Sequence, residues 1–212
     1  VRTGAVTKRS HAETRWETDP SITVAEATAH SRWLLEKAVA RQLVADVEVG
    51  VMLSGGLDSS TIAALTAQVL GNGDFHTFSI GFEDDSFNES HHARAVAQQL
   101  GTNHHTVMIR PEDVETRLSG VISAIGEPYA DGSALPTAML AEVAREHVTV
   151  LLSGEGGDEM FSGYDTHAAS VARRWYRRLP EWLRTGAIGP TVNRLPVSHS
   201  KLSFDFKAKR FA

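Results

Sequence analysis

The stretch Val51–Leu65, "VMLSGGLDSSTIAAL", joins a short apolar run to a helical pattern through a loop rich in glycine and serine. Gly55 and Gly56 allow the backbone to adopt positive φ angles and to approach a ligand closely. The backbone N–H groups that open the following helix attract anions, because they point outward at the positive end of the helix dipole. The loop also offers hydroxyl groups on Ser54, Ser59 and Ser60. The stretch therefore predicts a phosphate-binding loop between a strand and a helix.

Other known loop types fit this stretch less well. A Walker A loop needs a lysine before its final serine or threonine, and there is none here. A nucleophile elbow needs glycine two residues before Ser54, where Met52 stands. A plain turn capped by Ser or Asp remains the simplest alternative. Asp58 would repel a phosphate unless a cation lay between them, so its presence predicts Mg²⁺, which carboxylate and phosphate oxygens share.

A second loop, residues 153–164, "SGEGGDEMFSGY", places acidic side chains among four glycines after another apolar run. The acids are Glu155, Asp158 and Glu159. Carboxylates this close together repel one another unless a metal ion or a substrate ammonium compensates them. An acid-capped helix start is the alternative. Ligands bind at the carboxyl ends of the strands in open α/β sheets, so both loops are expected to border one site.

Strand-like and helix-like segments alternate along most of the chain. Apolar or β-branched runs predict strands at 47–53, 76–82, 104–109 and 148–153. Apolar periodicity bounded by Gly or Pro predicts helices at 21–43, 59–70, 89–100, 111–126 and 135–147. This order predicts an α/β fold with a parallel sheet and helices on both faces. The strand at 148–153 is expected to be buried on both faces. The inward face of the first helix is expected to hold Trp33, Leu34, Ala38 and Val39.

Three segments differ in character. Residues 1–20 show no sustained period and are expected to form a linker or edge segment, whereas residues 21–168 hold the alternating elements. Residues 169–212 are basic, aromatic and interrupted by proline. They predict the start of a helical region whose remainder lies beyond this chain. Within them, "RRWYRRLPEWLR" is expected to form an amphipathic helix rather than a nucleic-acid-binding patch.

Composition excludes several classes of function. Twenty-one Lys and Arg face twenty-six Asp and Glu, a net charge of −5, so no overall basic bias indicates nucleic acid as a partner. No apolar run is long enough to span a membrane, and residues 1–20 contain no secretory signal. The chain has no cysteine, which excludes a disulfide, a thiolate metal site and a cysteine nucleophile within it. These features favour a cytoplasmic location.

The two loops together resemble those of a known family. "LSGGLDSS" is similar to the pyrophosphate-binding loop of the N-type ATP pyrophosphatases (the PP-loop superfamily). Combined with "LLSGEGGDEMFSGY", it resembles the C-terminal synthetase domain of the glutamine-hydrolysing asparagine synthetases. "SIGFEDDSFNESHHARAVAQQLGTNHH" and "GEPYADGSALPT" resemble further segments of these amidotransferases. The resemblance assigns residues 21–168 to an ATP pyrophosphatase-type synthetase domain.

The resemblance implies a role for each matching residue. The ATP-binding residues would be Met52, Leu53, Ser54, Gly55, Gly56, Ser59, Ser60, Ile80, Ser153 and Gly154, with Met52 and Ile80 beside the adenine. The Mg²⁺ ligands would be Asp58 and Asp158. Glu155 would be the catalytic residue.

The implied reaction is that of a carbon–nitrogen ligase. A carboxylate, expected to be the side chain of aspartate, is adenylated by ATP with release of pyrophosphate. Ammonia then forms the amide and releases AMP. Two alternatives stay open: an amidotransferase acting on another carboxylate (of a sugar, a peptide or a β-lactam-type precursor), or a nucleotide-binding module without chemistry. A homodimer is also compatible with the sequence.

Three features depart from the family pattern. The glutaminase domain with its N-terminal cysteine is not in this chain, so ammonia is expected from a domain outside it. The family's lysine from the later helical region has no match among Lys201, Lys207 and Lys209. The segment "YADGSALPT" differs from that of well-known asparagine synthetases, so the aspartate pocket cannot be transferred to it.

Two histidine pairs, His91–His92 and His104–His105, raise the question of a metal site. Side chains of adjacent residues are expected to point apart on a helix or a strand, which makes each pair a poor chelate. No third ligand stands at a suitable spacing in the sequence. We therefore expect no zinc site at these pairs.

Overall fold

The computed structural model describes residues 17–127 and 131–193. The α/β part of the chain has four strands, β1 (Val49–Met52), β2 (His76–Phe82), β3 (Asn103–Ile109) and β4 (Val150–Leu152). Around them lie α1 (Val24–Gln42), α2 (Leu57–Leu70), α3 (Ser90–Leu100), α4 (Pro111–Ile125), α5 (Ala134–Ala144) and α6 (Gly157–Phe161). The later part contains α7 (Asp165–Tyr176), α8 (Glu181–Leu183), a π-helical turn η1 (Arg184–Ile188) and α9 (Gly189–Asn193).

The strands form one parallel sheet in the order β3-β2-β1-β4. The chain moves outward from β1 to β2 and β3, and then returns to place β4 on the other side of β1. The strand order therefore reverses between β1 and β4. A crevice opens at such a point, because the connections from the two strands leave in opposite directions. The expected fold class, a parallel sheet in an α/β fold, is confirmed.

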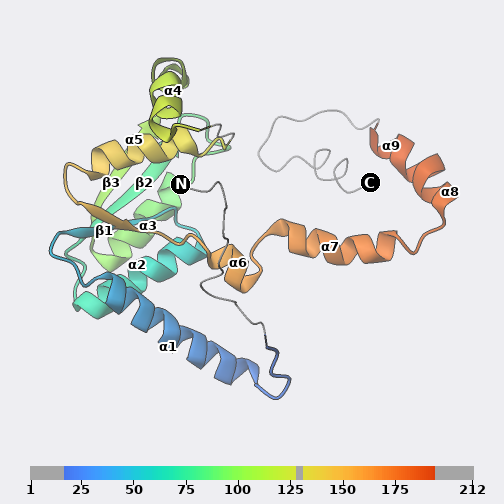
Figure 1. The fold of residues 1–212 in the computed structure, drawn as a ribbon, viewed down its shortest axis with the longest axis horizontal. Helices are drawn as coiled ribbons and strands as arrows, with labels where there is room; N and C mark the ends of the chain where they lie inside the picture. Colours follow the sequence, from blue (N-terminus) through green and yellow to red (C-terminus); the bar gives the residue numbers. More distant parts are fainter. Residues whose placement is uncertain (1–16, 128–130, 194–212) are drawn as a thin grey trace, which may run out of the picture.

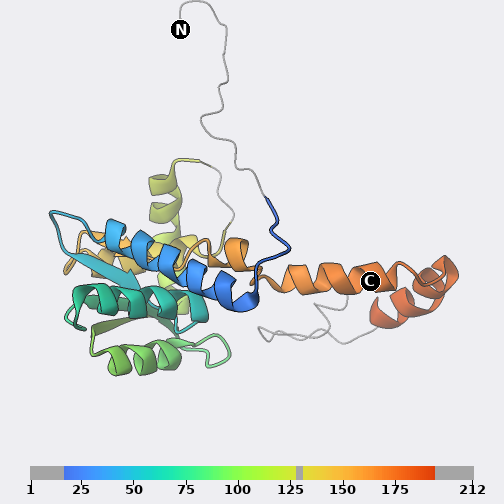
Figure 2. The same cartoon turned by 90° about the horizontal axis from the view of Figure 1, so that it is seen from below.

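Helices cover both faces of the sheet (Figure 1). On one face, Val51 of β1 and the following Leu53 pack with Ala63 of α2 and Ala93 of α3 in a buried cluster. On the other face, a second cluster joins Phe78 of β2 to α5 through Leu140 and Ala144, and a third joins β3 to α5. Figure 2 shows α1 and α2 side by side, and α1 packs mainly against α2. The alternating side chains of β1 and β2 thus belong to two separate cores.

The helix boundaries follow the expected chemistry. The Thr23 hydroxyl accepts a hydrogen bond from the Glu26 backbone N–H, and the Glu26 carboxylate accepts one from the Thr23 N–H, so a capping box opens α1. Helices α2, α3 and α4 each end at a glycine in the left-handed conformation, Gly71, Gly101 and Gly126.

Two burial predictions were wrong. Val150 of β4 is 38% exposed, and Leu151 and Leu152 are only partly buried, because β4 is the edge strand of the sheet that the described residues form. Trp33 and Leu34 are also exposed, at 47% and 48%, whereas Val39 is 4% exposed. Helix α1 packs mainly against α2, so much of its surface, including Trp33 and Leu34, stays uncovered.

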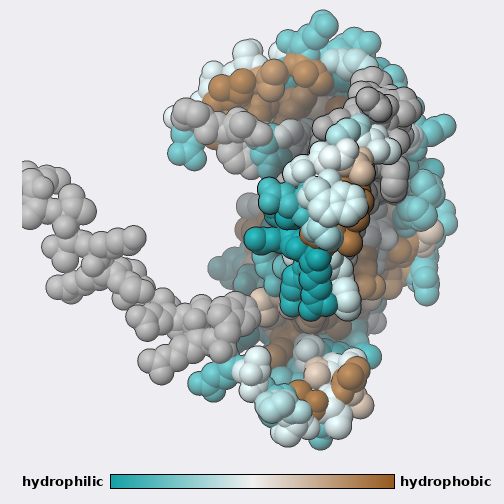
Figure 3. Space-filling view, turned by 90° about the vertical axis from the view of Figure 1, so that its right-hand side faces the viewer, coloured by the Kyte–Doolittle hydropathy of each residue, from teal (hydrophilic) through white to brown (hydrophobic). Residues whose placement is uncertain are grey.

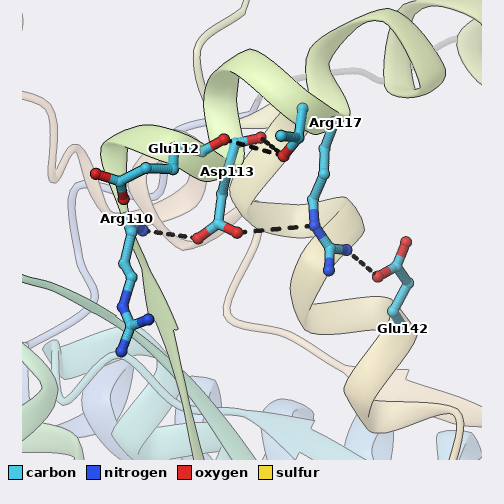
Figure 4. Close-up of polar contacts among 6 residues, drawn as sticks. Arg110, Glu112, Asp113, Arg117 and Glu142 are labelled. Atoms are coloured by element: carbon cyan, nitrogen blue, oxygen red, sulfur yellow. Dashed lines mark hydrogen bonds and ion pairs between the residues drawn. The ribbon is translucent and has the colours of Figure 1, made fainter.

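Helix α4 is fixed to α5 by charged side chains (Figure 4). The Asp113 carboxylate accepts a hydrogen bond from the Arg110 N–H at 2.8 Å, and it lies 3.8 Å from the Arg117 guanidinium. Arg117 also donates to Glu142 of α5. Helix α4 also leaves apolar side chains exposed, and a brown band of apolar surface lies at the top of Figure 3. The exposed apolar side chains of α4 belong to Val114, Leu118, Ile122 and Ile125.

Helices α7, α8 and α9 extend from the sheet as an arm (Figures 1 and 2). The segment "RRWYRRLPEWLR" does not form one helix as expected. Helix α7 ends at Tyr176 and α8 begins after Pro180, which cannot continue an α-helical hydrogen-bond ladder. The expected domain boundary after residue 168 falls inside α7, and the division into domains stays a prediction. Among the described helices, none combines the length and the apolar character needed to cross a membrane.

Candidate active site

The loop after β1 is held in shape by its serines. The Leu53 N–H donates to the Phe78 carbonyl at 2.7 Å, which extends the pairing of β1 with β2 up to the loop. The Ser59 hydroxyl accepts a hydrogen bond from the Ser54 N–H at 3.1 Å, and the two hydroxyls lie 2.9 Å apart. The Ser54 hydroxyl also accepts from the Gly56 N–H at 3.2 Å. The first turn of α2 is thereby fastened to the end of β1.

Gly55 is required at its position for two reasons. Its φ of +82° lies in the left-handed region, which L side chains rarely adopt. A Cβ built on it would also lie 2.5 Å from the backbone nitrogen of Ala93, at the start of α3. The backbone of this loop therefore follows a path that only glycine allows.

The N-terminus of α2 has no side-chain cap. Its N-cap residue is Gly56, and no side chain there accepts a hydrogen bond from the helix. The simplest alternative for this loop was a turn capped by Ser or Asp, and the structure does not contain that cap. The first N–H groups of an α-helix have no partner within the helix, so an uncapped start leaves donors for an anion.

The loop after β4 packs directly against the start of α2. A Cβ on Gly154 would lie 2.7 Å from the Ser59 nitrogen, and one on Gly157 would lie 2.5 Å from Cγ of Asp58. Gly156 between them has a φ of +91°. Glycine at these positions brings the acids of both loops together, at the point where the strand order reverses. The expectation that the two loops border one site agrees with this contact.

A cavity of about 530 Å³ opens between the two loops and the α5 face of the sheet. Ten of the predicted site residues line it: Met52, Leu53, Ser54, Asp58, Ser59, Ile80, Ser153, Gly154, Glu155 and Asp158. Three do not: Gly55, Gly56 and Ser60. Gly55 and Gly56 shape the loop, as described above. The Ser60 hydroxyl is buried beneath the helix start, without a hydrogen-bond partner in the structure. The ligand roles of all these residues stay predictions.

The cavity has an apolar end and an acidic end. At the apolar end, Met52 and Ile80 lie on the α5 face of the sheet beside Phe78 and Leu140. At the acidic end lie the carboxylates of Asp58, Glu155, Asp158 and Glu159. Such a cavity suits a ligand with a flat apolar ring and a charged tail. The carboxylate oxygens are of the type that Mg²⁺ prefers, so these residues fit a hard divalent cation.

Several lining residues were not found from the sequence. Tyr164 lies at the cavity and donates a hydrogen bond to Glu159. This bond lowers the pKa of Glu159 and raises the pKa of Tyr164 to about 12, so the pair stays an ionised acid and a neutral phenol near neutral pH. Glu89, the N-cap residue of α3, also borders the cavity. From the other side, α5 contributes Pro136 and Thr137.

The histidine pairs behave differently from each other. His104 and His105 point to opposite faces of β3, as expected, whereas the ring centroids of His91 and His92 lie only 3.9 Å apart. The expectation that no third ligand accompanies the pairs was wrong. One nitrogen of His105 and one nitrogen each of His76 and His147, two histidines outside these sequence pairs, lie within 4.8 Å of one another. Their separation in the sequence concealed this cluster.

The sequence profile described as asparagine synthase matches residues 30–210. The chain belongs to the asparagine synthase family. This membership confirms the family resemblance that the two loops predicted, and the observed fold class agrees with it.

Relatives within the asparagine synthase family are similar over most of this chain. One is named putative asparagine synthetase [glutamine-hydrolyzing] 2, from Methanocaldococcus jannaschii. It is 40% identical over 164 residues, which cover 77% of this chain and 31% of that protein. Another, from Mycobacterium bovis, is named putative asparagine synthetase [glutamine-hydrolyzing]. It is 38% identical over 163 residues, covering 77% and 24%. The chain thus spans less than a third of the length of these two relatives.

Among solved structures, one match is a glutamine-dependent NAD⁺ synthetase from Acinetobacter baumannii in complex with adenosine diphosphate. It aligns with a TM-score of 0.49 at 18% identity, covering 70% of this chain and 29% of that chain.

Proposed function

We propose that this chain is the ATP-dependent synthetase part of an asparagine synthetase-like amidotransferase. One observation carries the proposal: two glycine-rich, acid-bearing loops meet at the reversal point of a parallel sheet and border a cavity with an apolar end. Membership of the asparagine synthase family supports it. The substrate class is a carboxylate, with the aspartate side chain as the first candidate.

The proposed reaction has two steps. In the first, a carboxylate oxygen bonds to the α-phosphorus of ATP, and the bond from that phosphorus to the pyrophosphate breaks. In the second, ammonia bonds to the activated acyl carbon, and the bond from that carbon to AMP breaks. The first step is needed because a free carboxylate is a poor electrophile, whereas AMP is a good leaving group.

Each loop has a part in this proposal. Ser54, Ser59 and the uncapped N–H groups of α2 bind the pyrophosphate portion of ATP, while Met52 and Ile80 pack against the adenine. Asp58 and Asp158 hold Mg²⁺. When bound, this ion supplies positive charge that offsets the negative charge of the departing pyrophosphate.

Glu155 has a different part from the two aspartates. It sits directly after Gly154 in the loop that follows β4, and its N–H donates to the Ser153 hydroxyl at 3.3 Å. We assign it to the reacting acyl group rather than to the phosphates. There it accepts the proton that the attacking ammonia loses as the amide forms. The ammonia comes from a glutaminase domain outside this chain.

Pyrophosphate–ATP exchange tests the function directly. The chain, or a longer protein containing it, is incubated with labelled pyrophosphate, Mg²⁺-ATP and one carboxylic acid at a time. Label entering ATP with aspartate supports the proposal as stated. Exchange only with a sugar acid, a peptide or another acid would retain the proposed adenylation reaction but replace aspartate as the substrate. Nucleotide binding without exchange for any acid, in the longer protein, would leave a binding module and refute the ligase assignment.

A further inference from the structure

Three imidazole rings meet at the edge of the sheet opposite the cavity. His76 is the first residue of β2, His105 lies in β3 beside Phe78, and His147 follows the end of α5. Their ring centroids are separated by 5.2 Å for His76 and His105, 5.0 Å for His76 and His147, and 4.2 Å for His105 and His147. All three side chains are partly buried. None of the three lines the nucleotide cavity.

The nitrogens of these rings are placed for a shared ligand. Nδ1 of His76 lies 2.9 Å from Nε2 of His105, a hydrogen bond in the structure. One nitrogen from each of the three residues lies within 4.8 Å of the others. In a tetrahedral site with metal–nitrogen bonds of about 2.0–2.1 Å, two ligand nitrogens are about 3.3 Å apart. The His76–His105 pair is therefore close to this spacing, and binding requires a ring rotation that brings a nitrogen of His147 to the same distance.

The chemistry of the three side chains suits a metal ion. A histidine binds a metal through the lone pair of its neutral form. Three imidazoles with an open fourth position form a donor set that zinc uses, and copper and nickel also accept imidazole.

We propose that His76, His105 and His147 form a binding site for one divalent transition-metal ion, with Zn²⁺ as the representative ion. The ligands come from β2, from β3 and from the segment after α5. A bound ion therefore ties the end of α5 to the sheet. Phe78, whose ring centroid lies 5.0 Å from that of His105, forms an apolar side of the site. The alternative is that the same rings only stack on one another and exchange a hydrogen bond.

Isothermal titration of the chain with ZnCl₂ separates these possibilities. Excess Mg²⁺ is included throughout, so that the acidic cavity is already occupied by a hard cation. We expect one site per chain with micromolar or tighter affinity. Two variants, His105→Gln and His147→Gln, should each weaken binding by at least about tenfold, because each removes one of three ligands. The matched control is the double variant His91→Gln/His92→Gln, a neighbouring pair on the exposed side of α3, which should bind like the parent.

Two further measurements make the outcome decisive. Replacing Zn²⁺ by Co²⁺ should give the intense visible absorption of a tetrahedral site, and His147→Gln should abolish it. Zn²⁺ should also raise the melting temperature of the parent, because an ion that binds only the folded state stabilises it. His147→Gln, at a partly exposed position after a helix, keeps the test valid if His105→Gln does not fold. Absence of Zn²⁺ binding, or equal binding by the parent and His147→Gln, would overturn the proposal and leave aromatic stacking.

Discussion

The two ends of the parallel strands, here called the carboxyl edge and the amino edge of the sheet, carry different donor atoms. At the carboxyl edge, Asp58 and Asp158 present oxygens beside glycine-rich backbone. At the amino edge, His76, His105 and His147 present nitrogens from three separate elements. Oxygen donors suit Mg²⁺ and phosphate chemistry, whereas imidazoles suit zinc-like ions. The two proposals place chemically different sites at opposite ends of the parallel strands of one small sheet, with Phe78 lining the cavity and also bordering the histidine cluster.

The largest effect is expected for Glu155→Gln, in a protein that contains this chain and forms the amide. The substitution removes the proposed proton acceptor but keeps size and most contacts. We expect amide formation to fall about a hundredfold, while Mg²⁺-ATP binding stays near the parental value. Rates of AMP and amide release and a separate nucleotide titration measure the two properties. Glu115→Gln, on the exposed side of α4, is the control. Amide synthesis near the parental rate would remove Glu155 from the mechanism.

Asp58→Asn should damage binding rather than turnover. Loss of one carboxylate from the acidic end weakens the hold on Mg²⁺, so we expect Mg²⁺-ATP to bind about tenfold or more weakly. Gly157→Ala should act in the same direction, because its Cβ would displace the Asp58 carboxylate, 2.6 Å away at Oδ2. Asp84→Asn, on the exposed loop after β2, is the control. Circular dichroism checks that the fold is retained.

The same Asp58 variant tests whether the two edges are independent. Zn²⁺ binding by Asp58→Asn should equal that of the parent, and Mg²⁺-ATP binding by His105→Gln should do the same. If either substitution weakened the binding of both Zn²⁺ and Mg²⁺-ATP, the proposed independence of the two edges would be wrong.

A smaller effect is expected from acid at the amino edge. Desolvation lowers the pKa of His104 and of His105 in the folded chain, and Arg94 adds to this effect for His104. The unfolded chain then binds protons more readily, so the free energy of unfolding falls as pH drops below about 6.5 and is fully retained above it. Urea unfolding from pH 7.5 to 5.5, without added metal, measures the slope. His104→Gln/His105→Gln should make the slope shallower; an unchanged slope would contradict this origin.

The sequence predicted the carboxyl edge better than the amino edge. Each loop there is a continuous stretch, so the types and order of its residues predicted a ligand-binding loop, and the expected parallel sheet brought the two loops to the same edge. Tyr164 and Pro136 were missed, because their place at the cavity depends on how α5 and the segment after α6 pack. The histidine cluster was missed for the same reason. His76 and His147 carry no local signal, and only strand register and the position of α5 bring them to His105.

The burial errors have a related cause. The residues of β4 form an apolar run like that of a central strand, yet β4 lies at an edge of the sheet formed by the described residues. Strand order is a property of the whole sheet, and a single segment does not encode it. Trp33 and Leu34 show the same limit for a helix. The positions of apolar residues along the helix do not predict how much of its surface the neighbouring elements bury.

The smallest effect is expected in α4, away from both edges. Gly120 lies inside this helix, and a Cβ on it would meet no heavy atom within 4 Å. Glycine inside a helix costs about 0.5–1 kcal/mol relative to alanine, because the unfolded chain loses more conformational freedom on folding. Gly120→Ala should therefore raise the melting temperature by about 1–4 °C, and leave Mg²⁺-ATP and Zn²⁺ binding unchanged. Calorimetry and the two titrations measure these properties. A change in either affinity would show that α4 is energetically coupled to one of the two sites, and the two edges could then no longer be treated separately from α4.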